Sequence, residues 1–400
     1  MTGLSRSEAA LVEPIEHAPM LEQTLAWAAV NSGTRNLSGN AAMAQRLADA
    51  FSVLPGTVEF VDPEAVQVIS AEGELLSVEA GKHLVVRIRP DTDRRVLLTG
   101  HMDTVFAAED PFQTCEWLDE RRLRGPGVLD MKGGIALMLA ALRAFETSLP
   151  SLGYDVLINS DEETGSTSSA ALIAALAKGK LAALTYEPSL PGGIIARARP
   201  SSGNFSAVVK GRAAHAGRNP QDGRNAIVAG ADLAVRLANA RRPELSVNPA
   251  KIDGGGPNNV VPDLAVVRFN IRTRGADDAA EATDLIDRLV KEVSAAHDVS
   301  IELHGGMGRP AKPISAATER LFALVKGAAA DLGDELSWQD SGGVCDGNNI
   351  ASCGVPVIDT MGACGEFIHS PHEYLDTASL VPKARLSALV LHRLDQGSYQ

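Results

Sequence analysis

The chain has 400 residues, and its 37 Lys and Arg against 50 Asp and Glu give a formal net charge of −13, with histidine taken as neutral. Apolar residues make up 45% and charged residues 22% of the chain, which is typical of a soluble globular protein with roughly two domains. The acidic balance argues against nucleic acid as the main partner, because phosphate binding requires a basic face.

Strands and helices alternate in the first half of the chain. Short apolar runs predict buried strands over 95–100, 154–159 and 181–186. Between them, 133–147 is apolar almost all round and 168–178 is also predicted to be helical, so both should pack against a sheet. This alternation is typical of a largely parallel sheet that is covered by helices on both faces.

The pattern changes between about residue 197 and residue 309. The elements expected there follow the order strand, helix, strand, strand, helix, strand, which is typical of a ferredoxin-like unit of small-domain size. The six expected elements are strands over 204–212, 245–252, 264–274 and 299–304 and helices over 225–240 and 276–297.

After this unit the α/β pattern returns, with a helix expected over 318–332 and a strand over 355–359. The simplest organisation is one α/β domain, formed by residues 1–197 and 312–400, that is interrupted by an inserted domain over 198–311. The predicted fold class is therefore α/β with a mixed, largely parallel sheet and an inserted ferredoxin-like α+β domain.

Ionisable side chains follow three of the predicted strands where each strand ends. His101 and Asp103 follow the first strand, the acidic run 161–163 follows the second, and Glu187 follows the third. Functional groups gather at the carboxyl ends of strands in open α/β sheets, so these side chains should meet at one edge. Two glycine-rich loops add Asp130, just before the helix expected at 133, and His369.

Each of these residues has a structural interpretation when taken alone. An H-x-D triplet is more often a turn with a hydrogen-bonded histidine, consecutive acids often begin a solvated helix, and Glu187 before a proline can shape a turn. Taken together they favour a metal site, because carboxylates crowded at one sheet edge need cations. Imidazole and carboxylate ligands suit zinc, and a carboxylate shared by two ions about 3.5–4 Å apart would give a hydrolytic centre.

Cysteines and apolar runs indicate the compartment. Four scattered cysteines without a C-x-x-C pair fit neither a disulfide framework nor a structural zinc site, and they predict free thiols in a reducing compartment. Residues 1–19 lack the apolar run of a secretory signal, and the chain has no charge-free run of about 18 apolar residues to span a membrane. We therefore expect a cytoplasmic protein without a membrane partner.

The ordered motifs resemble those of the co-catalytic dizinc carboxypeptidases and aminoacylases over about residues 96–380. The motifs are TGHMDTV, DMKGG, SDEETGS, TYEPS and FIHSPHE. Within this family the chain is most similar to the glutamate carboxypeptidases of the folate-cleaving carboxypeptidase G type, and more distantly to acetylornithine and succinyl-diaminopimelate deacylases. The resemblance implies a zinc-exopeptidase-like catalytic domain with an inserted lid, and it implies amide hydrolysis.

The resemblance also assigns roles to the candidate residues. Asp130 would bridge two zinc ions, with cobalt or manganese as possible substitutes, and the peptide bond after it would be cis. Asp103 would orient an imidazole, and Glu162 would be the general base. The five implied zinc ligands are His101 and Glu187 for the first ion, Glu163 and His369 for the second, and Asp130 for both.

The inserted domain matches the family as well. His215 in AAHAG resembles the histidine that reaches the active site of the other subunit and stabilises the oxyanion. Asn259 and Arg272 stand where the family contacts substrate, and Arg309 resembles the arginine that binds the substrate's carboxylate. The alternatives are structural: His215 could shape a turn, and the two arginines could be surface ion-pair partners.

Two positions depart from the family pattern. Asn270 stands where an acid commonly lies two residues before the arginine. Cys345 lies in SGGVCDG, where relatives have small or hydroxyl residues, and we expect it to fill space rather than act as a nucleophile. Gly343 and Asp346 of the same segment suit a loop that lines the substrate pocket.

The sequence thus predicts a zinc-dependent metallocarboxypeptidase or amidohydrolase that releases a C-terminal, glutamate-like amino acid with a free carboxylate. Its expected partners are a short peptide or acyl-amino-acid substrate and a second copy of the chain, paired through the inserted domain. Two alternatives stay open, namely an N-acyl amino-acid deacylase of the acetylornithine or succinyl-diaminopimelate type and a catalytically inactive binding protein. Glu162 beside a full ligand set argues against the second alternative.

Overall fold

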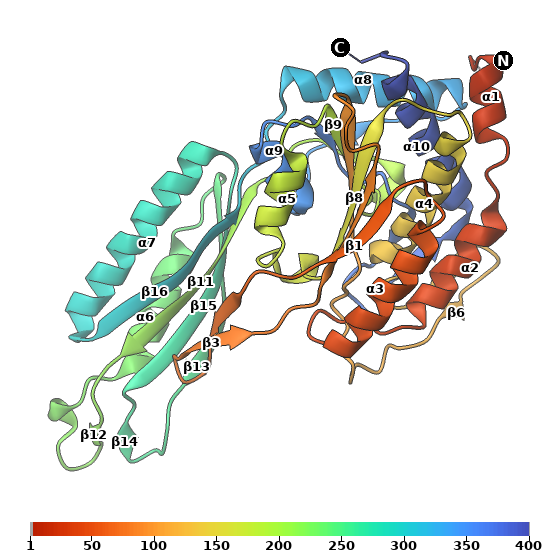
Figure 1. Ribbon diagram of the computed structural model, residues 1–400. Helices are drawn as coiled ribbons and strands as arrows, with labels where there is room; N and C mark the ends of the chain where they lie inside the picture. Colours follow the sequence, from red (N-terminus) through yellow and green to blue (C-terminus); the bar gives the residue numbers. More distant parts are fainter. Residues whose placement is uncertain (1–2, 400) are drawn as a thin grey trace.

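A six-stranded mixed sheet forms the centre of the larger domain (Figure 1). The computed structural model describes residues 3–399. Four strands of the sheet are parallel to one another, β4 is antiparallel to β8, and β1 is antiparallel to β4 at the edge. In spatial order the strands are β1 (Thr57–Val61), β4 (His83–Ile88), β8 (Gly153–Asn159), β5 (Arg95–His101), β9 (Ala182–Thr185) and β18 (Val357–Ile358).

Alternate residues of the central strands pack into two separate cores. In β5, Leu98 belongs to the core on one face and Leu97 to the core on the other, as expected for parallel strands that are buried on both faces. The first face is covered by α1 (Arg6–Val12), α2 (His17–Ala28), α3 (Leu37–Phe51), α4 (Gly133–Glu146), α8 (Ala316–Asp331) and α10 (Leu380–Asp395). The second face is covered by α5 (Ala170–Ala177) and α9 (Asp346–Ser352).

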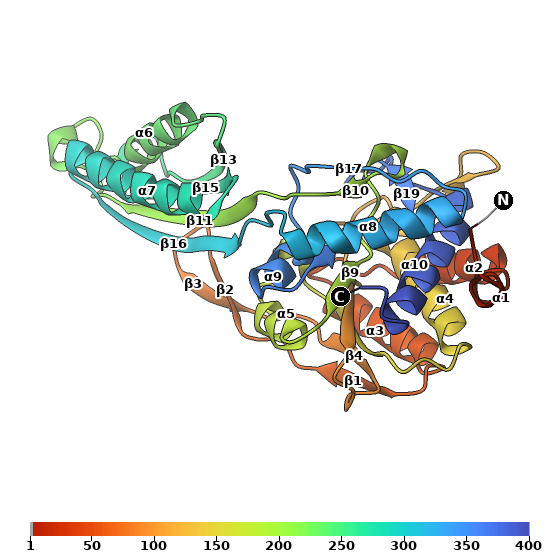
Figure 2. The ribbon, with the colours of Figure 1, turned by 90° about the horizontal axis from the view of Figure 1, so that it is seen from above.

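The inserted domain, called the lid below, is an antiparallel sheet with two helices on one face (Figure 2). Its strand order confirms the predicted ferredoxin-like unit. In spatial order the strands are β13 (Leu245–Gly254), β15 (Leu264–Thr273), β11 (Ser201–Lys210) and β16 (Ser300–Arg309), and the helices are α6 (Ala226–Asn239) and α7 (Ala276–His297). A small pair of strands, β12 (Ala214–His215) and β14 (Val260–Val261), lies at the end of the lid farthest from the larger domain.

Smaller strands complete the larger domain. A four-stranded sheet beside the carboxyl ends of the central strands consists of β19 (Cys364–Glu366), β20 (Tyr374–Asp376), β7 (Arg122–Arg124) and β6 (Glu116–Trp117). Two pairs remain, β10 (Ile195–Ala196) with β17 (Trp338–Gln339), and the hairpin β2 (Val66–Ile69) with β3 (Leu75–Val78). Within residues 3–399, no helix is both long enough and apolar enough to cross a membrane.

The chain passes from the larger domain into the lid and back again through two segments, called the crossings, which meet at a buried joint. The backbones of Arg199 and Lys312 hydrogen-bond to each other where the two segments run side by side. Both side chains bind the fully buried Asp359 carboxylate, with Arg199 Nε at 2.6 Å and Lys312 Nζ at 2.8 Å. One carboxylate therefore holds both crossings at the end of β18.

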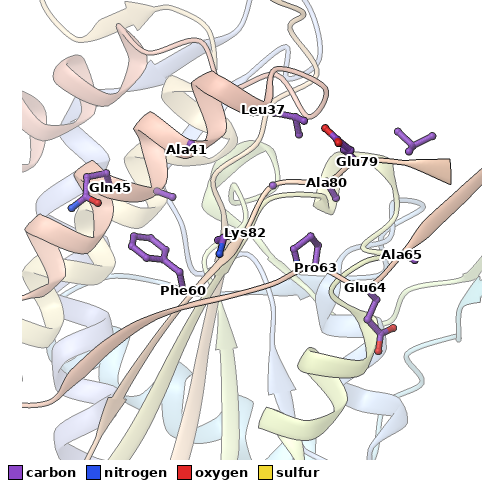
Figure 3. A pocket seen from close by; sticks show the side chains of 13 residues that line it. Leu37, Ala41, Gln45, Phe60, Pro63, Glu64, Ala65, Glu79, Ala80 and Lys82 are labelled. Carbon is purple, nitrogen blue, oxygen red and sulfur yellow. The ribbon is translucent and has the colours of Figure 1, made fainter.

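The β2–β3 hairpin makes a second connection to the lid. It lies against the lid face opposite the helices, where Ile69 packs on Val208 and Val266 and Arg268 donates to the carbonyls of Ile69 and Ser70. Its two connecting segments and α3 enclose a surface pocket of about 550 Å³ (Figure 3). The pocket walls come from α3, β1 and these connectors, so the pocket is separate from the candidate metal centre described below.

The predicted elements are present with small changes in their ends. Helix α7 has the predicted bounds, whereas β16 runs past the predicted end at residue 304 to Arg309. The extension passes through Gly305, whose φ of +95° is accessible to glycine, beside an irregularity in the pairing with β11. The strand therefore continues through a glycine-rich segment that resembles a loop in sequence.

Candidate metal centre

The carboxyl ends of β5, β8 and β9 bring most of the predicted ligands together. His101 is the last residue of β5, the turn Glu162–Thr164 follows β8, and Glu187 lies just beyond β9. Asp130 lies in η1 (Val128–Lys132), a short irregular turn that leads into α4 and is called the Asp130 loop below, and His369 lies between β19 and β20. Residues far apart in the chain therefore meet at one edge of the sheet, where the sequence predicts a site.

These side chains form two clusters that share Asp130. Its Oδ1 lies 3.1 Å from His101 Nε2, and its Oδ2 lies 3.2 Å from His369 Nε2. His101 Nε2 also lies 3.9 Å from a Glu187 oxygen, and His369 Nε2 lies 3.0 Å from Glu163 Oε2. Each cluster offers one imidazole, one carboxylate of its own and one oxygen of Asp130, with the donor atoms within 4.8 Å of one another.

Asp103 lies behind the first cluster and organises several groups. His101 Nδ1 lies 2.9 Å from the Asp103 carbonyl oxygen and 3.5 Å from its carboxylate, so the main-chain contact is the shorter one. The fully buried carboxylate accepts hydrogen bonds from the Thr34 hydroxyl at 2.7 Å and from the backbone N–H groups of Glu162 and Glu163. Asp103 thereby ties the end of β5 to the acidic turn after β8.

Glu162 lies outside both clusters and faces the lid. Its Oε1 is 2.7 Å from a guanidinium nitrogen of Arg309, the last residue of β16. The same guanidinium lies 3.3 Å from Asp346 Oδ1 and donates to the Ser166 hydroxyl at 2.9 Å. Burial raises the pKa of Glu162 to about 7, and Arg309 opposes this rise. A group with such a pKa can both accept and return a proton near neutral pH.

The carboxylates crowded in the two clusters would be stabilised by bound cations. Burial raises the pKa of Glu163, and burial with the neighbouring Glu162 raises that of Glu187. The pKa of His369 rises to about 11, because its imidazole hydrogen-bonds Asp130 and Glu163. Imidazole nitrogens and carboxylate oxygens are donors that zinc accepts. The residues therefore fit two divalent ions that share one carboxylate.

Close packing holds the Asp130 loop in place. The peptide bond between Asp130 and Met131 is cis, as the resemblance implies. A Cβ on Gly134 would lie 2.3 Å from the Tyr186 carbonyl oxygen, so glycine is needed where α4 begins against the end of β9. This close approach explains the second glycine of the DMKGG motif, and a Cβ on the first, Gly133, would lie 2.6 Å from the Val128 carbonyl oxygen.

The lid residues divide into two groups. His215 in β12 and Asn259 just before β14 are exposed, and this strand pair lies at the end of the lid farthest from the larger domain (Figure 1). Arg272 lies at the joint, where it donates to the Gly342 carbonyl at 2.5 Å and to the Asn270 side chain at 3.3 Å. Asn270, which stands where the family commonly has an acid, therefore still accepts a hydrogen bond from Arg272.

The glycine-rich segment before α9 packs against the joint. The Gly343 carbonyl accepts a hydrogen bond from Arg199 at 3.0 Å, and Asp346 is buried against Arg309. Cys345 is buried as well, and its burial raises the pKa of the thiol well above the usual value. A protonated, buried thiol agrees with the expected space-filling role.

Three residues that support the site were not predicted from the sequence. Thr34 donates a hydrogen bond to Asp103, and nothing in its local sequence marks it. Ser166 accepts a hydrogen bond from Arg309, and the available signal was its position as the last residue of the SDEETGS motif. Glu373 is buried and accepts hydrogen bonds from the backbone around Asp130. It belongs to the FIHSPHE motif, so an acid four residues after a predicted ligand was the available signal.

Known proteins resemble this chain in sequence and in fold. The model of peptidase family M20/M25/M40 matches residues 97–393. The chain is 30% identical to carboxypeptidase G2 of Pseudomonas sp. (strain RS-16), over 79% of this chain and 78% of that protein. It is also 30% identical to a succinyl-diaminopimelate desuccinylase of Pseudoalteromonas atlantica, over 74% and 82%. A tripeptidase of Staphylococcus aureus has the same fold, with a TM-score of 0.76, 21% identity and coverage of 96% and 99%.

Proposed function

The chain belongs to peptidase family M20/M25/M40, and on this premise we propose that it is a dizinc carboxypeptidase. As a member of the family it is a metallohydrolase. The proposed substrate is a peptide or acyl amino acid whose last residue is glutamate-like and carries a free carboxylate. The enzyme would cleave the amide bond that precedes this residue.

One observation carries the proposal, namely that two ligand clusters share Asp130 while Glu162 stands beside both without belonging to either. A site built only to store a metal would not need this additional acid, whose side chain is only 11% exposed. In a hydrolase, such an acid has a defined task, because a proton must leave the attacking water and reach the departing amine.

The two clusters would hold the ions through the five residues described above, with Asp130 common to both. When bound, the ions would polarise the scissile carbonyl group and make a water molecule acidic enough to attack at neutral pH. A Glu162 carboxylate oxygen would take the proton of the attacking water and deliver it to the leaving nitrogen. Asp103 would keep Glu162 in place through the hydrogen bond to its backbone N–H.

Arg309 supports the preference for a free carboxylate. Its guanidinium is buried beside Glu162 and can bind a carboxylate through two parallel N–H groups. Because Arg309 pairs with Glu162 and Asp346 in the structure, a substrate carboxylate would replace the Glu162 oxygen as its partner. Arg272 and Gly343 near the joint, and Asn259 of the lid, are proposed as further substrate contacts.

The test is a Glu162→Gln variant, which keeps the shape of the side chain but cannot accept the proton. We expect it to bind zinc with wild-type stoichiometry and to lose hydrolysis of a folate-like glutamate conjugate by several orders of magnitude. Glu366→Gln, an exposed acid near His369, is the control and should keep full activity. A Glu162→Gln variant that turns over at the wild-type rate would rule out this mechanism.

A deacylase is the second candidate, because the desuccinylase from Pseudoalteromonas atlantica is also 30% identical to the chain, as carboxypeptidase G2 is. The same centre would then cleave a succinyl or acetyl group from an amino acid. Kinetics on folate-like, N-succinyl and N-acetyl substrates side by side would separate the two candidates. A kcat/KM that is highest for an N-acyl amino acid would favour the deacylase.

We further propose a homodimer that pairs through the lid, with His215 acting in the site of the partner subunit. The position of His215 at the far end of the lid supports this, since it cannot serve the cluster of its own chain from there. Size measurement in solution tests the dimer.

Four unpaired cysteines support a reducing compartment, so we propose a cytoplasmic enzyme.

A further inference from the structure

Glu373 is a buried acid that the proposed mechanism does not use. Only 1% of its surface is exposed, and it lies just before β20. Its Oε1 accepts hydrogen bonds from the backbone N–H of Leu129 at 2.9 Å and from that of Asp130 at 3.1 Å. A single oxygen therefore binds two successive N–H groups of the loop that carries the shared carboxylate.

The backbone of Glu373 is tied to the same region. Its carbonyl oxygen accepts a hydrogen bond from Gly125 at 3.2 Å, and its N–H donates to the Ser370 carbonyl at 3.1 Å. The second bond closes a turn that begins next to His369. One short segment thus carries a candidate ligand of the second cluster at one end and the support of the Asp130 loop at the other.

We propose that Glu373 is a positioning residue that fixes Asp130 relative to His369 through the two backbone hydrogen bonds at its Oε1. The proposal rests on the proposed function, because it assumes that both residues hold metal ions. Loss of the bonds would leave two N–H groups buried without a partner and would free the loop to turn Asp130 away. Groups that orient metal ligands typically affect metal affinity by about 10–100-fold when removed.

Two substitutions separate hydrogen bonding from charge. Glu373→Ala removes the acceptor, whereas Glu373→Gln keeps an oxygen that can accept both bonds. Glu146→Ala is the matched control, since Glu146 is a mostly buried acid that pairs with Arg89. It ends α4, about 20 Å along the helix from the Asp130 loop at 1.5 Å per residue.

Zinc affinity is measured by competition with a chromophoric chelator, together with the melting temperature of the metal-free proteins. We expect zinc to bind about 10–100-fold more weakly to Glu373→Ala, and to bind Glu373→Gln within a few-fold of wild type. Glu146→Ala should lose stability but keep its affinity. A structural role alone would lower the melting temperature of Glu373→Ala without changing the affinity.

Two results would overturn the proposal, either wild-type affinity in folded Glu373→Ala or an equal loss in Glu373→Ala and Glu373→Gln. These measurements need no substrate, so they are independent of which amide is cleaved. A wild-type protein that binds zinc but hydrolyses none of the substrates tested would count against the proposed function and leave the role of Glu373 standing. A wild-type protein that binds no divalent ion would overturn both.

Discussion

His101 and His215 are both selected by sequence motifs, yet the structure surrounds them differently. His101 is 1% exposed, and its two ring nitrogens face Asp103 and Asp130. His215 is exposed at the end of the lid, and its Nδ1 accepts hydrogen bonds from the N–H groups of Gly217 and Arg218 two and three residues away. Distant parts of the chain complete the surroundings of His101, whereas the hydrogen bonds of the His215 ring are formed with residues next to it in the sequence.

This difference teaches which part of a site a single chain can build. The partners of His101 are Asp103, just beyond the end of its own strand, and Asp130, in the segment before α4, while Glu187 follows the neighbouring strand β9. The fold of one chain therefore brings them together. A side chain at the end of an extended lid acquires partners only when another surface approaches it. The same contrast predicts which substitutions abolish the centre within one chain and which require a second chain to show their effect.

The largest effect is expected from Asp130→Ala, which removes the carboxylate common to both clusters. The zinc content should fall at both positions. Activity should fall by more than about 10³-fold, which is the loss caused by removing one oxyanion donor. Metal analysis and kcat/KM measure the two effects. Asp119→Ala, at an exposed acid of the β6–β7 turn, should change neither. An Asp130→Ala variant that keeps two ions would contradict the conclusion that Asp130 and its neighbours form the metal centre within one chain.

The next largest effect is expected at the buried joint between the lid and the larger domain. Asp359→Ala would leave the buried Arg199 and Lys312 without their shared carboxylate, which should destabilise the fold by about 3–5 kcal/mol. Urea unfolding of the metal-free proteins measures this loss. Asp340→Ala is the control on the same crossing, because its ion pair with Arg197 is exposed to solvent and should contribute little to stability. Equal losses in both variants would show that burial of the joint does not matter.

His215→Ala tests the proposal that His215 acts only when a second chain is present. We expect kcat to fall by about 10²–10³-fold, as for an oxyanion donor, with zinc content unchanged. Mixing this variant with Glu162→Gln should restore part of the activity, because a mixed dimer contains one site with both wild-type groups. If mixed dimers form, as native mass spectrometry can verify, and no activity returns, His215 does not act on the partner subunit.

The sequence predicted most of what depends on strand periodicity and on motifs. The ends of β5, β8 and β9 were expected from apolar runs, and the meeting of the candidate ligands after them was expected from the topology of a parallel sheet. The supports of the site were not predictable, because Glu373 and Thr34 act on backbone and side chains that only the folded chain brings near. The pairing of Arg309 with Glu162 depends in the same way on how the lid meets the larger domain.

The smallest effect concerns a histidine behind the acidic turn, His83, which is fully buried on β4. Its Nδ1 accepts a hydrogen bond from the Ser160 N–H at 3.3 Å, and its Nε2 lies 3.4 Å from the Ser168 carbonyl oxygen. Burial lowers the pKa of His83 below its usual 6.5, although Asp161, Asp346 and, more weakly, Asp103 oppose the shift. The folded protein therefore keeps this imidazole neutral at a pH where the unfolded chain protonates it.

The sign of the pH dependence follows from this depressed pKa. Below about pH 6.5 the unfolded state binds the additional proton, so the contribution of His83 to stability is present above that pH and is lost as the pH falls. His83→Gln removes the titration, so the difference in unfolding free energy between wild type and variant should shrink from pH 7.5 to pH 5.5. Urea unfolding of both metal-free proteins measures it, and the other titrating groups cancel in the comparison. A difference that stays constant over this range would mean that His83 takes up its proton as readily in the folded chain as in the unfolded one.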